Sequence, residues 1–166
     1  MKLLIASDLH GSLAYAKKLI EIYTKDSYDH LVLLGDILYH GPRNPLPMDY
    51  NPKEVALLLN QYKDEILCVQ GNCDSEVDQM VLDFKIEPKI HMIIDRYDCY
   101  LEHGHHLSSY KKGSIVLHGH THIVRCEEID GVTYLNPGSI TLPKDGKRMV
   151  IIYDNGFSFY NIEEFK

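Results

Sequence analysis

The sequence has 166 residues, a formal net charge of −7 with neutral histidines, and ordinary shares of apolar (45%) and charged (25%) residues. This length and mixture are typical of a globular protein, and we expect a single domain over residues 1–166. The acidic balance argues against a protein that grips duplex nucleic acid through a basic surface. No apolar run is longer than five residues, which is too short to cross a bilayer, so we expect no membrane span.

The four cysteines are consistent with a reducing compartment. They form no Cys-x-x-Cys pair, and Cys68, Cys99 and Cys126 lie in strand-like apolar segments, where a reduced thiol acts as a small apolar group. The apolar residues at the N-terminus end at Asp8 without the cleavage site of a signal peptide. We therefore expect a cytoplasmic protein with reduced thiols.

The first two-thirds of the chain alternate strand and helix patterns. Apolar runs predict strands at residues 2–7, 31–34 and 66–69. Apolar residues at helical spacing predict a helix over residues 13–23, and Asn51 followed by Pro52 is typical of a second helix start. Ser75 or Asp74 is expected to cap a third, short helix.

The last third of the chain changes to a strand-rich pattern. Asp130-Gly131 and Asn155-Gly156 are strong hairpin signals. Strands are predicted for residues 90–94, 97–102, 114–117, 123–129, 132–135, 148–153 and 157–162. Because no linker or repeat separates the two parts, we expect one domain in which two sheets pack face to face, with helices outside.

Polar side chains follow five of the predicted strands, at the point where each strand ends. They are Asp8, His10, Asp36, Asn72, His103, His120 and His122. Ligand sites in α/β sheets form beyond the carboxyl ends of strands, and side chains two residues apart in extended backbone point the same way. We therefore expect Asp8 with His10, and His120 with His122, to converge on one point.

Each of these positions has an ordinary explanation when it is taken alone. Gly35-Asp36 and Gly71-Asn72 are common turn sequences, and Gly119 can simply mark a bend. The joint pattern favours a metal site, because oxygen and nitrogen donors gather at successive strand ends. Seven donors are too many for one tetrahedral zinc ion and suit two divalent ions that share a carboxylate. Mn²⁺, Fe²⁺, Zn²⁺ and Co²⁺ all accept such donors.

Six short motifs follow one another along most of the chain. They are DLHG (8–11), GDILYHG (35–41), GNCDS (71–75), EHGH (102–105), HGHTH (118–122) and NPGS (136–139). This ordered series resembles the calcineurin-like metallophosphoesterases, and among them it is most similar to the bacterial YfcE-type phosphodiesterases. The resemblance implies a four-layer αββα sandwich, in which two mixed β-sheets pack face to face with helices outside.

The resemblance also implies a centre of two divalent metal ions, with Mn²⁺ as the first expectation. One ion would be held by Asp8, His10 and His122, the other by Asn72, His103 and His120, and Asp36 would bridge them. The implied reaction is hydrolysis of a small phosphodiester by a hydroxide that bridges the ions. His118 lies outside this motif, and we interpret it as a structural or neighbouring residue.

Cys73 departs from the pattern of many relatives, which carry histidine in a Gly-Asn-His-Asp/Glu motif and use it as a general acid or a phosphate contact. A thiol is a poor match for an imidazolium in that role, so the departure favours phosphodiesters or activated leaving groups. The alternative is that Cys73 only fills space beside the metal ions. Without its histidine partner, Asp74 is expected to cap a helix rather than to act in catalysis.

Some residues are candidates to replace the missing acid or to bind the phosphate. His40 and His105 are placed to contact the phosphate or protonate the leaving oxygen, and a guanidinium such as that of Arg43 suits a non-bridging oxygen. The predicted catalytic residues are Asp36, Asn72, His40 and His105, and the predicted substrate contacts are Arg43, Cys73, His40 and His105. Solvation in a surface loop is the alternative for His40, His105 and Arg43.

The sequence is also compatible with other functions of the same fold. The same centre would serve a phosphomonoesterase or a nuclease, although the acidic charge disfavours a duplex substrate. A non-catalytic interaction scaffold is a further alternative, and the complete ligand set argues against it. A homo-oligomer is also compatible with the sequence.

Overall fold

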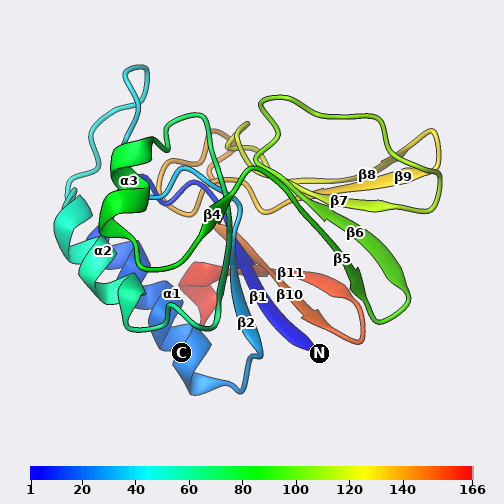
Figure 1. Cartoon of the computed structure of the whole chain (residues 1–166), viewed down its shortest axis with the longest axis horizontal. Helices are drawn as coiled ribbons and strands as arrows, with labels where there is room; N and C mark the ends of the chain where they lie inside the picture. The colour runs from blue at the N-terminus through cyan, green and yellow to red at the C-terminus, as the bar shows by residue number, and fades with distance from the viewer. Residues whose placement is uncertain (166) are drawn as a thin grey trace.

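The computed structural model describes residues 1–165, which form two β-sheets and a small set of helices (Figure 1). The helices are α1 (Leu13–Lys25), α2 (Pro52–Asn60), α3 (Glu76–Val81) and the 3₁₀ helix η1 (Ile162–Glu164). The strands are β1 (Lys2–Ala6), β2 (His30–Leu33), β3 (Ile66–Val69), β4 (Ile86–Glu87), β5 (Ile90–Ile94), β6 (Tyr97–Leu101), β7 (Ile115–Leu117), β8 (Arg125–Ile129), β9 (Val132–Asn136), β10 (Met149–Asp154) and β11 (Phe157–Asn161).

Both sheets are mixed, as expected. The six-stranded sheet has the order β11-β10-β1-β2-β3-β4, with β1 to β4 parallel and β10 antiparallel to β1. The five-stranded sheet has the order β5-β6-β7-β9-β8, with β6, β7 and β9 parallel. Parallel strands end at one edge of their sheet, so the segments that leave β1, β2 and β3, and those that leave β6 and β7, begin at common edges.

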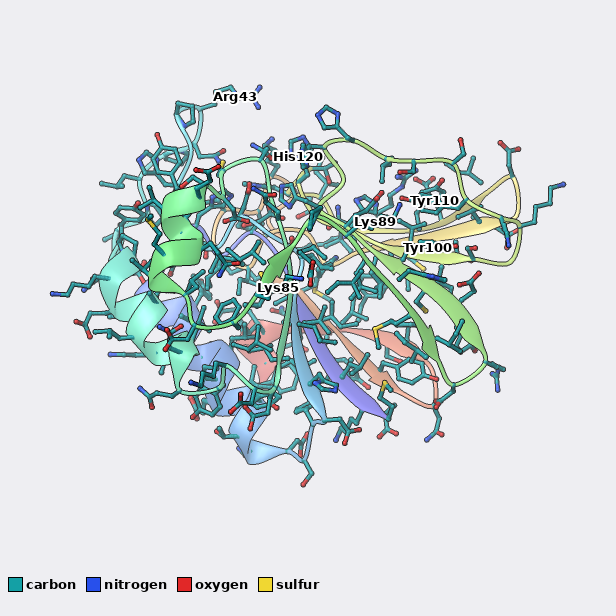
Figure 2. All side chains as sticks on the ribbon, viewed as in Figure 1. Arg43, Lys85, Lys89, Tyr100, Tyr110 and His120 are labelled. Atoms are coloured by element: carbon teal, nitrogen blue, oxygen red, sulfur yellow. The ribbon has the colours of Figure 1, made fainter. Side chains whose placement is uncertain are left out.

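The helices α1 to α3 lie on one side of the molecule and the five-stranded sheet lies on the other (Figure 1). The layer order is therefore helices, six-stranded sheet, five-stranded sheet. Residues 102–114, between β6 and β7, form an irregular loop, so that connection adds no helix to the five-stranded sheet. The loop between β2 and α2 projects outward and carries Arg43 at its tip (Figure 2).

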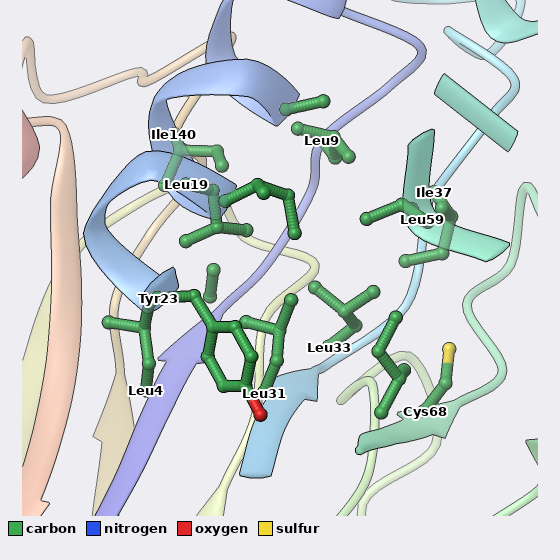
Figure 3. Packing of buried hydrophobic residues seen from close by; sticks show 14 of the residues in the cluster. Leu4, Leu9, Leu19, Tyr23, Leu31, Leu33, Ile37, Leu59, Cys68 and Ile140 are labelled. Carbon is green, nitrogen blue, oxygen red and sulfur yellow. The ribbon is translucent and has the colours of Figure 1, made fainter. Parts of the chain in front are cut away.

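Alternation along the central strands produces two apolar cores. Leu4, Leu31 and Leu33 pack with Leu19 of α1 and Leu59 of α2 between helices and sheet (Figure 3). The neighbouring positions point to the other face of the sheet. They are Leu3, Ile5, Val32, Leu34 and Val69, which pack against Cys99, Leu101, Ile115 and Leu117 of the second sheet. A sheet buried on both faces holds its strand ends in fixed positions.

Most predicted elements agree with the structure, but one short strand was missed, and of the two expected caps of α3, Ser75 and Asp74, only Ser75 is confirmed. The two-residue strand β4 was not predicted, because it is too short to show a pattern. Asp74 does not cap α3: Ser75 occupies the cap position, in a capping box with Asp78. Within residues 1–165, no helix has the length and apolar character needed to span a bilayer.

Candidate metal centre

The seven candidate ligands come together beyond the carboxyl ends of the strands, through an unusual backbone conformation. Five of them have positive φ values: Asp8 (56°), His10 (48°), Asp36 (57°), His120 (70°) and His122 (59°). The expectation of extended backbone at these positions is therefore wrong, although Asp8 and His10 do converge on one group. The left-handed conformation costs about 1–2 kcal/mol per residue, so surrounding contacts must hold these loops in place.

Hydrogen bonds from distant segments hold the loop that carries Asp8. The Ser139 hydroxyl donates to the Asp8 carbonyl at 2.7 Å, and the Thr141 hydroxyl donates to the Leu9 carbonyl at 2.7 Å. The backbone amide of Asp8 donates to the Gly35 carbonyl at 3.1 Å. Sequence reasoning missed the roles of Ser139 and Thr141, although the NPGS motif that contains Ser139 was a signal for them.

Backbone carbonyls orient three of the four candidate histidines. Nδ1 lies 2.8 Å from the Tyr39 carbonyl in His10, 2.7 Å from the Leu34 carbonyl in His103 and 2.8 Å from the Leu142 carbonyl in His122. A carbonyl oxygen only accepts, so each Nδ1 carries the proton that it donates. In the neutral ring, Nε2 then presents a lone pair to the centre, as in a metal-ligating histidine.

Asp8, His10 and His122 form one compact group of potential ligands. His122 Nε2 lies 3.2 Å from Asp8 Oδ1 and 3.0 Å from His10 Nε2. His10 Nε2 lies 3.7 Å from Asp8 Oδ1. All three residues are buried, with at most 3% of their surface exposed. The carboxylate and the two rings thus face one another within the span of a single ion.

A second group lies next to the first. His103 Nε2 is 3.0 Å from Asn72 Oδ1, and His120 Nδ1 is 2.7 Å from the same oxygen. Asp36 lies between the groups, because its Oδ2 is 3.3 Å from His103 Nε2 and 3.7 Å from His10 Nε2. The other carboxylate oxygen, Oδ1, accepts a hydrogen bond from the amide of Cys73 at 2.8 Å. The position of Asp36 is the one that a bridging carboxylate needs.

The chemistry of this donor set fits bound cations. Asp8 Oδ2 accepts from the Ser7 hydroxyl at 2.6 Å and the His120 amide at 3.0 Å, whereas Asp8 Oδ1 is buried and has no hydrogen-bond partner. The facing Nε2 atoms of His10 and His122 each present a lone pair when both rings are neutral. Lone pairs repel unless positive charge lies between them, and a buried carboxylate oxygen without a partner is costly. A divalent cation satisfies both requirements.

The pKa values reflect the buried negative charge. Burial acts to raise the pKa of Asp36, but the hydrogen bond and charge of His103 outweigh it and lower the pKa to about 2. Burial acts to lower the pKa of His103, but the hydrogen bond with Asp36 and the charges of Asp8 and Asp36 raise it to about 9. Both shifts have the direction expected where buried carboxylates face imidazole rings, a setting that favours positive charge.

Asp74 joins two of the loops that carry candidate ligands. Its Oδ2 accepts from the amides of Asp36 at 2.8 Å and Gly71 at 2.7 Å, and its Oδ1 accepts from the amide of Ile37 at 2.8 Å. Burial is the main cause that raises its pKa to about 6, against these hydrogen bonds. Asp74 therefore fixes the ends of β2 and β3 relative to each other, a role that its position in the sequence did not reveal.

Gly119 lies where two loops pack too closely for a side chain. A side-chain carbon there would overlap the Ser7 hydroxyl and the Asp8 carboxylate. Gly119 thus lets the loop that carries His120 and His122 lie directly against the loop that carries Asp8. Of the two interpretations of Gly119, a simple bend or a residue that lets the chain bring the histidines in, the close approach favours the second.

The predicted substrate contacts lie at different distances from the centre. A cavity of about 650 Å³ lies over it and is lined by Asp36, Arg43, Cys73 and His122, among others. Burial and the charge of Asp36 raise the pKa of Cys73 to about 12, so its thiol is neutral at physiological pH. Lys144, which sequence reasoning missed, also lines this cavity.

The remaining histidines lie at different positions relative to the candidate metal centre. The His105 ring is exposed and lies 5.5 Å from the His103 ring and 6.1 Å from the His120 ring, measured between centroids. The His40 ring packs against Tyr39 and Tyr50 and is not part of the cavity wall. His118 is buried and its Nδ1 lies 3.2 Å from the Gly119 carbonyl, which agrees with a structural role.

Two mixed sheets with this edge site define the fold of a phosphoesterase. Residues 1–155 match the calcineurin-like phosphoesterase superfamily domain, and the chain belongs to that family and is a metallophosphoesterase. It is 41% identical over 152 residues to phosphodiesterase YfcE of Escherichia coli K12, a match that covers 88% of this chain and 83% of the relative. The solved structure of that E. coli phosphoesterase superimposes with a TM-score of 0.89 at 35% identity, covering 98% and 100% of the two chains.

More distant relatives share the fold. Phosphodiesterase MJ0936 of Methanocaldococcus jannaschii is 27% identical over 154 residues, which covers 83% of each chain. Vacuolar protein sorting 29 of Cryptosporidium parvum superimposes with a TM-score of 0.58 at 19% identity, covering 96% of this chain and 97% of that one. At such low identity the second likeness shows the fold alone, so function must be argued from the site.

Proposed function

We propose that this protein is a metal-dependent phosphodiesterase that holds two divalent ions, with Mn²⁺ as the expected metal. Asp8, His10 and His122 would hold one ion, Asn72, His103 and His120 the other, and Asp36 would bridge them. The observation that carries the proposal is the position of Asp36 Oδ2 between His10 and His103, at the meeting point of the two groups. Mixed carboxylate, imidazole and amide donors suit Mn²⁺ and its neighbours in the first transition series.

When bound, such a pair of ions lowers the pKa of water and neutralises charge that develops on a transferring phosphoryl group. The protein's own residues supply placement. Arg43 and Lys144 bring two cationic side chains to the cavity, where they can bind the non-bridging oxygens of a phosphate. Asp74 and Gly119 hold the loops, so the donors are in place before the substrate arrives.

The groups near the leaving oxygen favour an ester that departs without strong acid assistance. The Cys73 thiol is neutral but its raised pKa makes it a weak acid. Burial and the nearby charges of His103 and His106 lower the pKa of His105, so at neutral pH its ring is mainly unprotonated and its proton-donating form is scarce. We infer a preference for phosphodiesters and activated leaving groups over simple alkyl monoesters.

The same proposal includes where the enzyme works. All four cysteines are free thiols in the structure, which supports activity in a reducing compartment such as the cytoplasm. A small phosphate ester is the proposed substrate, because the cavity of about 650 Å³ has the size of a small-molecule site. We also keep the proposal that residues 1–166 act as a single domain.

The test compares metals and substrates on protein freed of metal. The chain is reconstituted with Mn²⁺, Zn²⁺, Fe²⁺ or Co²⁺ and assayed on bis(4-nitrophenyl) phosphate and 4-nitrophenyl phosphate. We expect activity with Mn²⁺, faster turnover of the diester, and two ions per chain by elemental analysis. The variant His122→Ala should lose metal and activity, whereas His91→Ala, an exposed histidine on β5, should keep both. Survival of metal and activity in His122→Ala contradicts the proposal.

A further inference from the structure

A second, larger hollow lies beside the cavity over the metal centre. It has a volume of about 920 Å³ and runs between α2, α3 and the loop that follows β2. We call it the apolar groove. Its main apolar lining residues are Leu38, Tyr39, Tyr50, Leu57, Val77 and Val81. The groove is thus lined by segments that lie far apart in the sequence.

The walls of the apolar groove contain apolar side chains that are exposed to solvent. Leu57 is 53% exposed, Val77 is 64% exposed and Val81 is 47% exposed. The two carboxylates in the walls are already used within the protein, since Asp74 accepts three backbone amides and Asp78 belongs to the capping box of α3. Lys53 also lines the groove and is exposed, so one cation lies beside a wall that is otherwise mainly apolar. This concave apolar wall, with its acidic groups occupied, is suited to an apolar ligand group.

The apolar groove is continuous with the proposed reaction site. Tyr39, Asn72 and Cys73 line both the groove and the cavity over the metal centre. Asn72 is a candidate ligand, and its Oδ1 touches His103 and His120. A molecule whose phosphate lies at the centre therefore has a direct path into the groove along Asn72 and Cys73.

We propose that the apolar groove binds one ester group of the substrate, and that this group is apolar and aromatic. The inference rests on the proposed function, because the phosphate of the same molecule must occupy the metal centre. The groove is larger than a methyl or ethyl group requires and matches the size of small-molecule sites that enclose ring systems. The tyrosines in its wall suit flat partners, since aromatic rings pack favourably face to edge.

Binding of stable phosphonates separates the groove from the chemistry. Methylphosphonate, phenylphosphonate and 1-naphthylphosphonate share one anionic group, and their carbon–phosphorus bond resists hydrolysis. We expect calorimetric titration of the Mn²⁺-loaded protein to show that phenylphosphonate binds ~10-fold more tightly than methylphosphonate, with a further gain for the naphthyl compound, because each added ring leaves water.

Substitutions by the uncharged residue asparagine then test whether the tighter binding of aryl phosphonates arises in the groove. Val77→Asn and Leu57→Asn place a polar amide in walls that are already half exposed, so neither change disturbs the core. Each should remove most of the aryl preference and leave methylphosphonate affinity unchanged. Met80→Asn is the matched control, because Met80 lies on α3, is 82% exposed and is outside the groove lining. It should keep the full preference and the wild-type rate on bis(4-nitrophenyl) phosphate.

The outcomes distinguish this inference from the function on which it rests. Equal affinity for methylphosphonate and phenylphosphonate in an active, Mn²⁺-loaded protein overturns the groove assignment alone. Absence of both metal binding and activity overturns the proposed function and the groove with it. If Val77→Asn instead converts a dimer to a monomer in sedimentation and leaves phosphonate affinities unchanged, the groove is an interface between copies of this chain, and the proposal is wrong.

Discussion

The two edges of the sheets use the same rare backbone conformation for different purposes. Within residues 1–165, eight non-glycine residues have a positive φ, and five of them are candidate ligands. The other three, Asp95, Asp130 and Asn155, form the turns β5–β6, β8–β9 and β10–β11. Strand register places these turns at the opposite edge, because Asp154 pairs with Lys2 at the start of β1, and the Asp95 turn precedes β6.

The difference lies in what holds each residue in place. The turn residues are exposed aspartates and an asparagine, types that adopt the left-handed region at low cost. The residues at the centre include three histidines, and buried or partly buried hydrogen bonds hold their loops in place. At the turn edge, the left-handed residues reverse the direction of the chain. At the metal centre, the left-handed residues orient the side chains of the candidate ligands. Changes at the turn edge should alter stability alone, and changes at the centre should alter activity.

Gly119→Ala should have the largest effect. The new methyl group would push the Asp8 loop and the His120 loop apart, and displacements of about 1 Å at a reacting centre cost on the order of 100-fold in rate. We expect kcat/KM on bis(4-nitrophenyl) phosphate to fall by about that factor. Gly156→Ala is the control, because its position at the turn edge has open space, and it should leave kcat/KM unchanged. Equal effects of the two substitutions on kcat/KM would contradict the proposed difference between the turn edge and the metal centre.

Asp74→Asn comes second. The amide nitrogen of the new side chain would face backbone N–H groups that now donate to a carboxylate, leaving at least one of them without an acceptor. We expect about 2–3 kcal/mol less stability in urea unfolding. Activity should drop ~10- to 100-fold, because Asp36 and Asn72 lose their common anchor. Asp78→Asn, in the exposed capping box, should lose only about 1 kcal/mol and keep its activity.

Metal removal should destabilise the protein measurably. Binding at 100 times Kd contributes about 2.7 kcal/mol, which for a chain of this size corresponds to roughly 5–10 °C in Tm. We expect a chelator to lower the Tm by about that amount and Mn²⁺ to restore it. In His122→Ala the Tm should not respond to Mn²⁺. An unchanged wild-type Tm after full chelation would mean that the buried donors are satisfied without cations.

Asp130→Ala should have the smallest effect, and it tests the turn edge directly. Alanine adopts the left-handed conformation at a cost of about 1 kcal/mol, so the free energy of unfolding should fall by about that much. Asp130→Gly should restore it, because glycine pays no such cost. Both variants should keep the wild-type kcat/KM. A loss of activity in either would show that the turn edge is coupled to the centre.

Much of the fold is predictable from local sequence. Apolar runs that end in Ser7-Asp8 and Gly35-Asp36 bound the first two strands closely, because burial on both faces demands unbroken apolar character. The hairpin at Asp130-Gly131 follows from turn chemistry. The predicted strands at residues 90–94 and 97–102 leave only Asp95-Arg96 between them, and a turn forms there although this pair lacks the glycine of a typical hairpin signal.

The sequence predicted that the seven candidate ligands gather at the strand ends, but it did not predict their geometry. The residue types at strand ends pointed to the seven donors, since chemistry limits which side chains bind metals. The support from Ser139, Thr141 and Asp74 depends on contacts between segments far apart in the chain, such as Asp8 and Ser139, which are 131 positions apart. The left-handed backbone at Asp8 and His120 was equally hidden, because only tertiary contacts stabilise it.

The most direct test of the central claim is anomalous diffraction from crystals grown with Mn²⁺. We expect two peaks roughly 3.5–4 Å apart, with Asp36 touching both and three of the remaining donors around each. A map with no peak among these side chains, or with a single peak that Asp36 does not contact, would contradict it.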